Sequence, residues 1–283
     1  MESRETISTE KIGKDRMPTI DKPERSSLPM PGKKIAITGK GGSGKTMLTA
    51  IMTKLLAGNE DMKLLTIDAD SAVNLPYALG IEVKNTVAET RRQIIEDPAA
   101  RAEIQDKNIR LVIEESVEMG NGFHLLVMGR PEGPGCYCSI NDLLRYGIEH
   151  VSRQYDITLI DCEAGPEQVN RRVVNGVHIL LIVTEPTIRG ARVSESILGV
   201  LERDKSIKPA HVGLVVNRFR GDDELITDIA KKWGLEIYGR IPEDQSITDY
   251  DTSGRPIIDL PDTSPSVIAT REVLKNLTLM RGD

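Results

Sequence analysis

The sequence predicts an α/β fold with a mostly parallel central sheet that is flanked by helices on both faces. Short apolar runs along the chain are continuous rather than alternating, which is typical of strands buried on both faces. Amphipathic segments separate these runs, and repeated strand–helix–strand order favours parallel pairing. Only 3% of the 283 residues are aromatic, so aliphatic side chains must build the core. The aromatic platforms that stack single-stranded nucleic acid are therefore not expected.

The apolar runs define the order of the predicted elements. The expected strands cover residues 33–38, 63–68, 123–128, 156–161, 177–183 and 211–216. After the first strand, apolar residues spaced by three and four from Leu48 to Leu56 predict a helix that ends at Gly58-Asn59. A last helix is expected over about 265–279. Because no repeat or second hydrophobic pattern points to another domain, residues 33–283 are predicted to form one domain.

Residues 1–32 differ from the rest of the chain. They mix charges of both signs with four prolines and show no periodicity, which predicts a disordered or loosely attached tail. The chain shows no signal-peptide pattern and no run near the roughly 18 apolar residues of a membrane helix. The net charge of −6 argues against nucleic acid or anionic lipid as a general partner, and three cysteines are too few for a disulfide framework. We therefore expect a cytoplasmic protein.

The segment GKGGSGKT, residues 39–46, follows the first strand and opens the first helix, and we call it the phosphate loop. Its glycines let backbone N–H groups turn inward around a β-phosphate, Lys45 reaches the β and γ oxygens, and Thr46 offers a hydroxyl to Mg²⁺. The residues expected to bind the nucleotide here are Gly39, Lys40, Gly41, Gly42, Ser43, Gly44, Lys45 and Thr46. The pattern predicts binding of ATP with Mg²⁺.

Lys40 adds a second lysine directly after the first glycine of the loop. The resulting KGGxGKT pattern resembles the deviant P-loop ATPases, the family of the nitrogenase iron protein and the MinD/ParA proteins. The resemblance implies an ATP hydrolase in which Lys40 crosses to the nucleotide of a partner subunit, so that ATP binding and homodimer formation are coupled. Met47 stands where such loops often carry a second threonine.

Acidic residues close two of the predicted strands. Asp68 and Asp70 end the second strand, and Asp161 follows the apolar segment DITLI. The resemblance implies that Asp70 orients or activates the attacking water and that Asp161 holds Mg²⁺ through water. With Lys40 and Lys45, these two carboxylates make up the predicted catalytic set. Each aspartate alone would also serve as an ordinary helix N-cap.

Two further strand ends are candidates for recognition of the base. Asn217 resembles the family's adenine-contacting asparagine, with Arg218 beside it as a stacking partner. The segment IPEDQSI resembles the loop whose backbone lines the other side of the base, which assigns Pro242 and Glu243 to the nucleotide site. Both segments are also compatible with ordinary turns.

Cys136 and Cys138 lie just before a predicted helix start, where Ser139 and Asp142 form a capping-box pattern. The partial positive charge of a helix N-terminus favours thiolate over thiol. Two thiolates do not fill a tetrahedral soft-metal site, but two such pairs meeting across a two-fold axis would, which suits Ni²⁺ or Zn²⁺. A redox dithiol and a purely structural zinc clamp are the alternatives.

The cysteine segment resembles the CooC-type accessory ATPases for nickel insertion into carbon monoxide dehydrogenase, and their relatives that mature acetyl-CoA synthase. The segments DCEAGPEQVNRR and EPTIRGARV are similar to the switch segment and the following turn of these ATPases. The resemblance implies a metallochaperone that dimerises with ATP and metal and releases the metal to a client nickel enzyme. Ser71 and Glu167-Gln168 depart from the family's Pro and Glu-His, which leaves the client open.

Two other functions compete with this one. An electron-transfer protein like the nitrogenase iron protein would hold a [4Fe–4S] cluster between subunits, but Ala164 occupies the position of its second ligand and Cys162 lies two residues away. Cys162 is instead expected to be a small buried residue. A positioning ATPase acting on DNA or membrane is disfavoured by the acidic balance and by the lack of a basic amphipathic segment after the last helix.

Overall fold

The computed structural model describes residues 32–96, 113–130, 149–165, 176–204 and 208–279. The predicted tail lies outside these ranges except for Gly32, as does most of the helix expected after Ser139, of which only residues 149–151 are described, as helix. Within the described residues, no helix combines the length and apolar character needed to cross a membrane.

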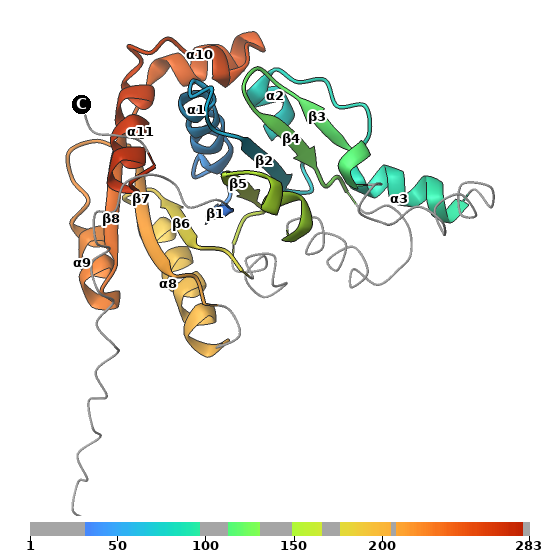
Figure 1. Cartoon of the computed structure of the whole chain (residues 1–283). Helices are drawn as coiled ribbons and strands as arrows, with labels where there is room; N and C mark the ends of the chain where they lie inside the picture. The colour runs from blue at the N-terminus through green and yellow to red at the C-terminus, as the bar shows by residue number, and fades with distance from the viewer. Residues whose placement is uncertain (1–31, 97–112, 131–148, 166–175, 205–207, 280–283) are drawn as a thin grey trace, which may run out of the picture.

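One eight-stranded sheet organises the molecule, in the order β3-β4-β2-β5-β1-β6-β7-β8 (Figure 1). The strands are β1 Lys33–Gly39, β2 Leu64–Ala69, β3 Val117–Met119, β4 His124–Val127, β5 Ile157–Cys162, β6 Ile179–Thr184, β7 His211–Phe219 and β8 Glu236–Pro242. All neighbouring strands run parallel except β3 and β4, which are antiparallel. The mostly parallel sheet is confirmed, and each predicted strand is present to within two residues at its start.

The two edge strands, β3 and β8, were not predicted from the sequence, for different reasons. β3 has only three residues, too few for a recognisable pattern. β8, with the sequence EIYGRIP, is an edge strand in which buried residues alternate irregularly with exposed and half-buried ones. Neither strand has the continuous apolar run that marks the strands inside this sheet.

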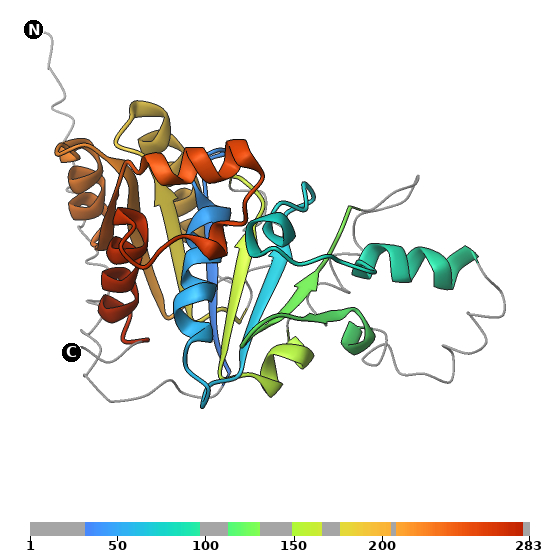
Figure 2. The ribbon, with the colours of Figure 1, turned by 90° about the horizontal axis from the view of Figure 1, so that it is seen from above.

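Helices cover both faces of the sheet (Figure 2). The helices are α1 Lys45–Ala57, α2 Leu75–Leu79, α3 Val87–Glu96, α8 Ile188–Arg203, α9 Glu224–Trp233, α10 Gln245–Ser253 and α11 Pro265–Asn276, with short 3₁₀ turns at Ser152–Gln154 and Ile257–Asp259. One buried cluster joins the sheet to α1, α2, α10 and α11, and a second joins it to α8, α9 and the start of α3. The rest of α3 extends beyond the β3 edge of the sheet (Figures 1 and 2).

The middle strand β1 shows why the apolar runs are continuous. Ile35 and Ile37 belong to the first cluster, whereas Ala36 between them belongs to the second, and all three are fully buried. β1 pairs with β5 on one side and β6 on the other. The chain leaves β1 toward β2 and later passes from β5 to β6, so the strand order reverses at the end of β1. In open α/β sheets this reversal is where ligands bind.

Candidate nucleotide-binding and hydrolysis site

The phosphate loop connects the end of β1 to the start of α1 and follows a backbone path that demands glycine. Gly39 has φ 146° and Gly44 has φ 95°. A Cβ at Gly39 would lie 2.1 Å from the carbonyl oxygen of Val183 in β6, and a Cβ at Gly44 would lie 2.2 Å from Nδ2 of Asn217. Neighbouring strand ends therefore press directly against the loop and fix its shape.

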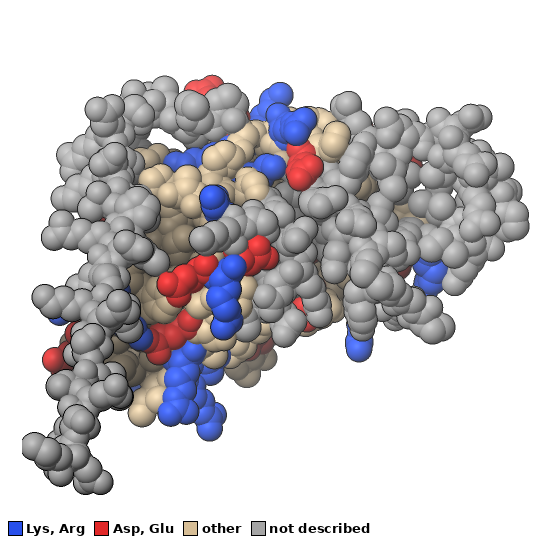
Figure 3. All heavy atoms as spheres, turned by 90° about the horizontal axis from the view of Figure 1, so that it is seen from below, with Lys and Arg blue, Asp and Glu red and all other residues tan. Residues whose placement is uncertain are grey.

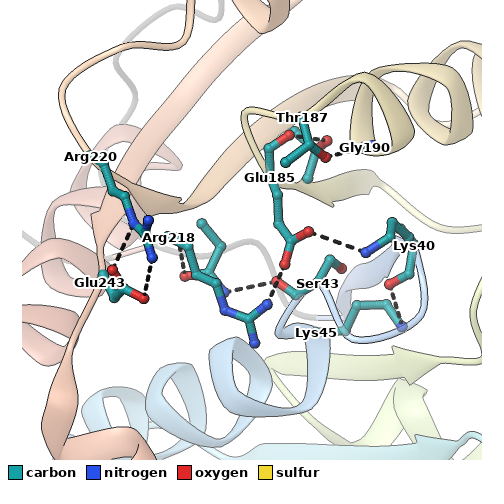
Figure 4. Close-up of polar contacts among 11 residues, drawn as sticks. Lys40, Ser43, Lys45, Glu185, Thr187, Gly190, Arg218, Arg220 and Glu243 are labelled. Carbon is teal, nitrogen blue, oxygen red and sulfur yellow. Dashed lines mark hydrogen bonds and ion pairs between the residues drawn. The ribbon is translucent and has the colours of Figure 1, made fainter.

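The polar groups of the loop fit an anionic ligand. No side chain of the described residues caps the N-terminus of α1, so its first N–H groups are available. The Ser43 hydroxyl is buried and has no hydrogen-bond partner among the described residues. Lys45 is only 6% exposed, and its Nζ donates to the carbonyl oxygen of Lys40 at 3.3 Å (Figure 4). This arrangement suits the phosphates of ATP.

Thr46 and Asp161, the two residues predicted to hold Mg²⁺, are hydrogen-bonded to each other beside the loop. Thr46 Oγ1 donates to Oδ2 of Asp161 at 2.6 Å, and Oδ1 of Asp161 is buried without a hydrogen-bond partner among the described residues. Burial raises the pKa of Asp161 to about 7, although the Thr46 hydrogen bond counteracts this. The two side chains would hold Mg²⁺, whose charge neutralises phosphate oxygens during transfer.

The two aspartates at the end of β2 have different environments. Asp68 is fully buried and accepts hydrogen bonds from the N–H groups of Asp70 and Leu75, and its burial raises its pKa to about 7. Asp70 is half-buried and accepts from the N–H of Ala72 at 2.9 Å. Asp68 thus holds the turn after β2 together, and Asp70 is the more accessible carboxylate.

The residues predicted to bind the base lie at or just after the ends of β7 and β8, and the structure shows which partners they have within the chain. Asn217 is 4% exposed, and its Nδ2 donates to the carbonyl oxygen of Ser43 at 2.8 Å. Pro242 ends β8, and Glu243 accepts two hydrogen bonds from Arg220, at 2.7 and 2.8 Å. This charged contact lowers the pKa of Glu243. Asn217 therefore supports the phosphate loop through its side-chain amide.

Glu185 is a site residue that is not among those predicted from the sequence. It follows β6, its side chain is 10% exposed, and it accepts hydrogen bonds from both Lys40 and Arg218 (Figure 4). Its sequence signal is the one that singled out Asp161, because both are acids directly after or at the end of an apolar strand. In the sequence, the segment that contains Glu185 predicts only a turn like that of the CooC-type ATPases.

Of the three cysteines, the structure describes Cys162. Cys162 is fully buried at the end of β5, and its burial raises the pKa of the thiol. This confirms a packing role for Cys162. Cys136 and Cys138 lie outside the described residues. Among the residues that the structure describes, no group of three or more His, Cys, Asp or Glu side chains is arranged to hold a metal ion.

Comparison with known proteins agrees with the site geometry. Residues 34–257 match the CobQ/CobB/MinD/ParA nucleotide binding domain, and the chain belongs to this family. An uncharacterized ATP-binding protein of Methanocaldococcus jannaschii is 34% identical over 250 residues, which are 86% of this chain and 97% of that protein. The carbon monoxide dehydrogenase accessory protein CooC of Rhodospirillum rubrum is 30% identical over 242 residues, covering 80% and 90% of the two chains.

The fold also matches a solved relative. The MinD cell division protein of Aquifex aeolicus superposes with a TM-score of 0.64 at 26% identity, covering 89% of this chain and 98% of that one. The family, the ATP-binding relatives and the phosphate loop together identify the chain as an ATP hydrolase of the MinD/ParA type.

Proposed function

We propose that this ATPase is a homodimeric metallochaperone whose cargo is Ni²⁺ or Zn²⁺ and whose client is a nickel enzyme, carbon monoxide dehydrogenase or acetyl-CoA synthase. The observation that carries the proposal is the Cys-Tyr-Cys spacing at Cys136 and Cys138. The 30% identity to CooC supports it. Two thiolates from each of two chains complete a four-ligand site, so cargo binding requires the dimer.

ATP supplies the switch between the loaded and the released state. In the proposed cycle the phosphate loop and Lys45 bind the phosphates, Thr46 and Asp161 hold Mg²⁺, and Asp70 orients the attacking water. Lys40 reaches the nucleotide of the partner chain, so that the dimer is stable only while ATP is bound on both sides. Hydrolysis then weakens the dimer, which separates the two cysteine pairs and frees the ion.

Metal analysis of anaerobically purified protein tests the proposal. With a non-hydrolysable ATP analogue present, we expect about one Ni²⁺ or Zn²⁺ per dimer, because four thiolates fill one tetrahedral site. The double variant Cys136→Ser/Cys138→Ser loses this metal. The control variant Cys162→Ala removes the buried third cysteine and retains it. Unchanged metal content in the double variant would overturn the proposal.

A MinD-type positioning ATPase is the second candidate, favoured by the extended likeness to the Aquifex aeolicus MinD protein. It predicts ATP-dependent binding to vesicles of anionic lipid or to DNA, with no dependence on Cys136 and Cys138. On the face shown in Figure 3, acidic and basic side chains of the described residues are intermixed rather than gathered into a basic patch. Cosedimentation with vesicles, with ATP and then with ADP, separates the two functions.

The iron–sulfur alternative predicts brown protein with a cluster spectrum after anaerobic purification. Cys162 lends it no support, because this side chain is fully buried at the end of β5, whereas a cluster shared between two chains needs sulfur ligands exposed at their interface. The same anaerobic sample therefore distinguishes the electron-transfer function from the metallochaperone by its colour.

A further inference from the structure

We infer that Glu185 is a positioning residue that holds Lys40 against its own subunit until a dimer forms. Its carboxylate is shared between two cations: Oε2 accepts from Lys40 Nζ at 3.1 Å, and Oε1 accepts from the Arg218 guanidinium (Figure 4). The inference rests on the proposed function in one respect, namely that Lys40 acts on the nucleotide of a partner chain.

The backbone around Glu185 is fixed, so the carboxylate has a defined place. Its carbonyl oxygen accepts from the N–H of Thr187 at 2.7 Å, and Thr187 in turn caps α8 through the N–H of Gly190. A Cβ at Gly190 would lie 2.5 Å from the same carbonyl oxygen. The turn between β6 and α8 is therefore tightly packed beneath Glu185.

The side chain of Lys40 can leave Glu185 while its backbone stays in the phosphate loop. Lys40 keeps its backbone in the phosphate loop, where its carbonyl oxygen accepts from Ser43 N–H and Lys45 Nζ, while its side chain alone turns to Glu185. That side chain is 27% exposed. Rotation of the side chain is thus enough to release Lys40, without any rearrangement of the loop.

Arg218 makes this release possible. Removing the last cation from a buried carboxylate is costly because the charge is left uncompensated. Glu185 has two cations, so it remains paired with Arg218 after Lys40 departs. Lys40, Arg218 and Glu185 together carry one net positive charge beside the phosphate loop. Of the two cations, Lys40 is the one whose side chain can turn away to bind the phosphate of a partner chain's nucleotide.

Arg218 also connects this cluster to the nucleotide site. Its φ of 52° is unusual for a residue other than glycine, and its N–H donates to Oδ1 of Asn217. Asn217 itself donates to the Ser43 carbonyl oxygen in the phosphate loop. Hydrogen bonds therefore connect the phosphate loop to Asn217, Arg218 and Glu185. A ligand bound in the loop would act through these contacts on the carboxylate that holds Lys40.

The first test measures the restraint itself in nucleotide-free protein. Acetylation of lysines by an N-hydroxysuccinimide ester is followed by mass spectrometry, with exposed Lys63 as the internal reference. The variant Glu185→Gln keeps the side-chain volume but loses the charge, and we expect Lys40 to react several-fold faster. The matched variant Glu195→Gln on α8, which breaks an exposed pair with Lys232 of α9, leaves the reactivity of Lys40 unchanged. Equal Lys40 reactivity in Glu185→Gln and the wild-type chain would overturn the inference.

A second variant, Arg218→Gln, should lower the acetylation rate of Lys40 instead of raising it. Arg218→Gln leaves Lys40 as the remaining cation on Glu185 among the described residues, so Lys40 should react more slowly than in the wild-type chain. This variant changes a side chain that is 56% exposed, so it keeps the test available even where Glu185→Gln fails to fold. Faster reaction of Lys40 in Arg218→Gln would contradict the shared-carboxylate arrangement.

The final test concerns the dimer. With Mg²⁺ and a non-hydrolysable ATP analogue, we expect Glu185→Gln to lower the dimer dissociation constant about threefold to tenfold, because no ion pair need be broken. In a Lys40→Ala background the same substitution has no effect, whereas an equal effect in both backgrounds would show that Glu185 acts only on the local fold. If Lys40→Ala leaves dimerisation unchanged, the proposed crossing of Lys40 fails, while the labelling experiments still decide whether Glu185 restrains it.

Discussion

At the scale of single residues, the site is a set of charged side chains arranged around the hydrogen-bonding groups of the phosphate loop. Lys45 is buried with its ammonium against a carbonyl oxygen, and Asp161 is buried with one oxygen unpartnered among the described residues. Buried charged groups are stable when they are paired with opposite charge. MgATP supplies both signs, since its phosphates match Lys45 and its metal matches Asp161.

The first prediction concerns Lys45. Lys45→Ala removes the buried cation that faces the β and γ phosphates, and we expect ATP turnover to fall at least about a hundredfold because phosphoryl transfer depends on charge neutralisation. A phosphate-release assay measures it. Lys63→Ala, which removes an exposed lysine just before β2, is the control and should retain wild-type turnover. Wild-type turnover in Lys45→Ala would be incompatible with the hydrolysis site described above.

At the scale of secondary-structure elements, the N-termini of helices follow the strand ends that carry the site residues. α8 begins at Ile188, three residues after Glu185, and its two glycines have contrasting surroundings. An added Cβ at Gly190 would lie 2.5 Å from the Glu185 carbonyl oxygen and 2.7 Å from Thr184 Oγ1, whereas at Gly199 it would meet nothing within 4 Å. The first glycine is required by close packing, and the second is a position where helix propensity alone decides.

This contrast gives the second prediction. Gly199→Ala should raise the free energy of unfolding by about 0.5–1 kcal/mol, because alanine is the better helix former. Gly190→Ala should lower it by about 1–3 kcal/mol, because the new methyl group displaces the turn that carries Glu185. Urea unfolding of both variants against the wild-type chain measures the two effects. Equal effects of the two substitutions would contradict the packing described for α8.

Asp244 joins two other helices. It caps α10 by accepting from Ser246 N–H, and its second oxygen accepts from the hydroxyl of Ser264 and the N–H of Ser266 at the start of α11. Burial by itself would raise the pKa of Asp244, but the serine hydrogen bonds together lower it to about 2. The ionised carboxylate thus ties the two helices together beside the proposed base loop.

The third prediction follows from this lowered pKa. A carboxyl whose pKa is lower in the folded chain stabilises it above the unfolded pKa near 4, and this stability is lost as pH falls through about 2. Asp244→Ala should therefore cost about 1–2 kcal/mol at pH 7 and progressively less below pH 4. Urea unfolding across this range measures the difference. Asp251→Ala, at an exposed acid of α10, is the control, and a pH-independent cost in Asp244→Ala would contradict the role of the ionised form.

At the scale of the whole molecule, the parallel sheet determines which chain segments meet. The carboxyl ends of β1, β2, β5, β6 and β7 lie at one edge, because neighbouring parallel strands end on the same side. Lys40 reaches this edge from the phosphate loop and remains 27% exposed at its side chain. A second chain approaching this edge would meet Lys40 and the nucleotide together.

The fourth prediction tests this assembly. Lys40→Ala should weaken dimerisation in the presence of a non-hydrolysable ATP analogue about tenfold, because one charge-assisted contact with phosphate is lost on each side. Sedimentation velocity with the analogue, and separately with ADP, measures the change. Lys63→Ala again serves as the control. Dimerisation of Lys40→Ala at wild-type strength would remove Lys40 from the interface.

The sequence by itself determined the fold class, the phosphate loop and the acids that follow the buried strands. Continuous apolar runs are a local signal of strands buried on both faces, and the loop's glycines, lysines and threonine are adjacent in the chain, so both are recognisable without tertiary information. The same reasoning found the first and last helices, although the last ends at Asn276 rather than near residue 279. The edge strands β3 and β8 lacked such a signal, because one is very short and the other is buried irregularly.

Only the tertiary structure decided how residues far apart in the chain share the site. Asn217 was a candidate for contact with the base, and the structure shows it supporting Ser43, 174 residues away in sequence. The sequence predicts no role for Glu185, and the structure places its carboxylate between Lys40 and Arg218. The sequence shows which side chains lie at the end of each strand, but the order of the strands in the sheet decides which of these side chains become neighbours. Since that order arises from long-range packing of the whole sheet, the charge pairing around Lys40 could not be read from any single segment.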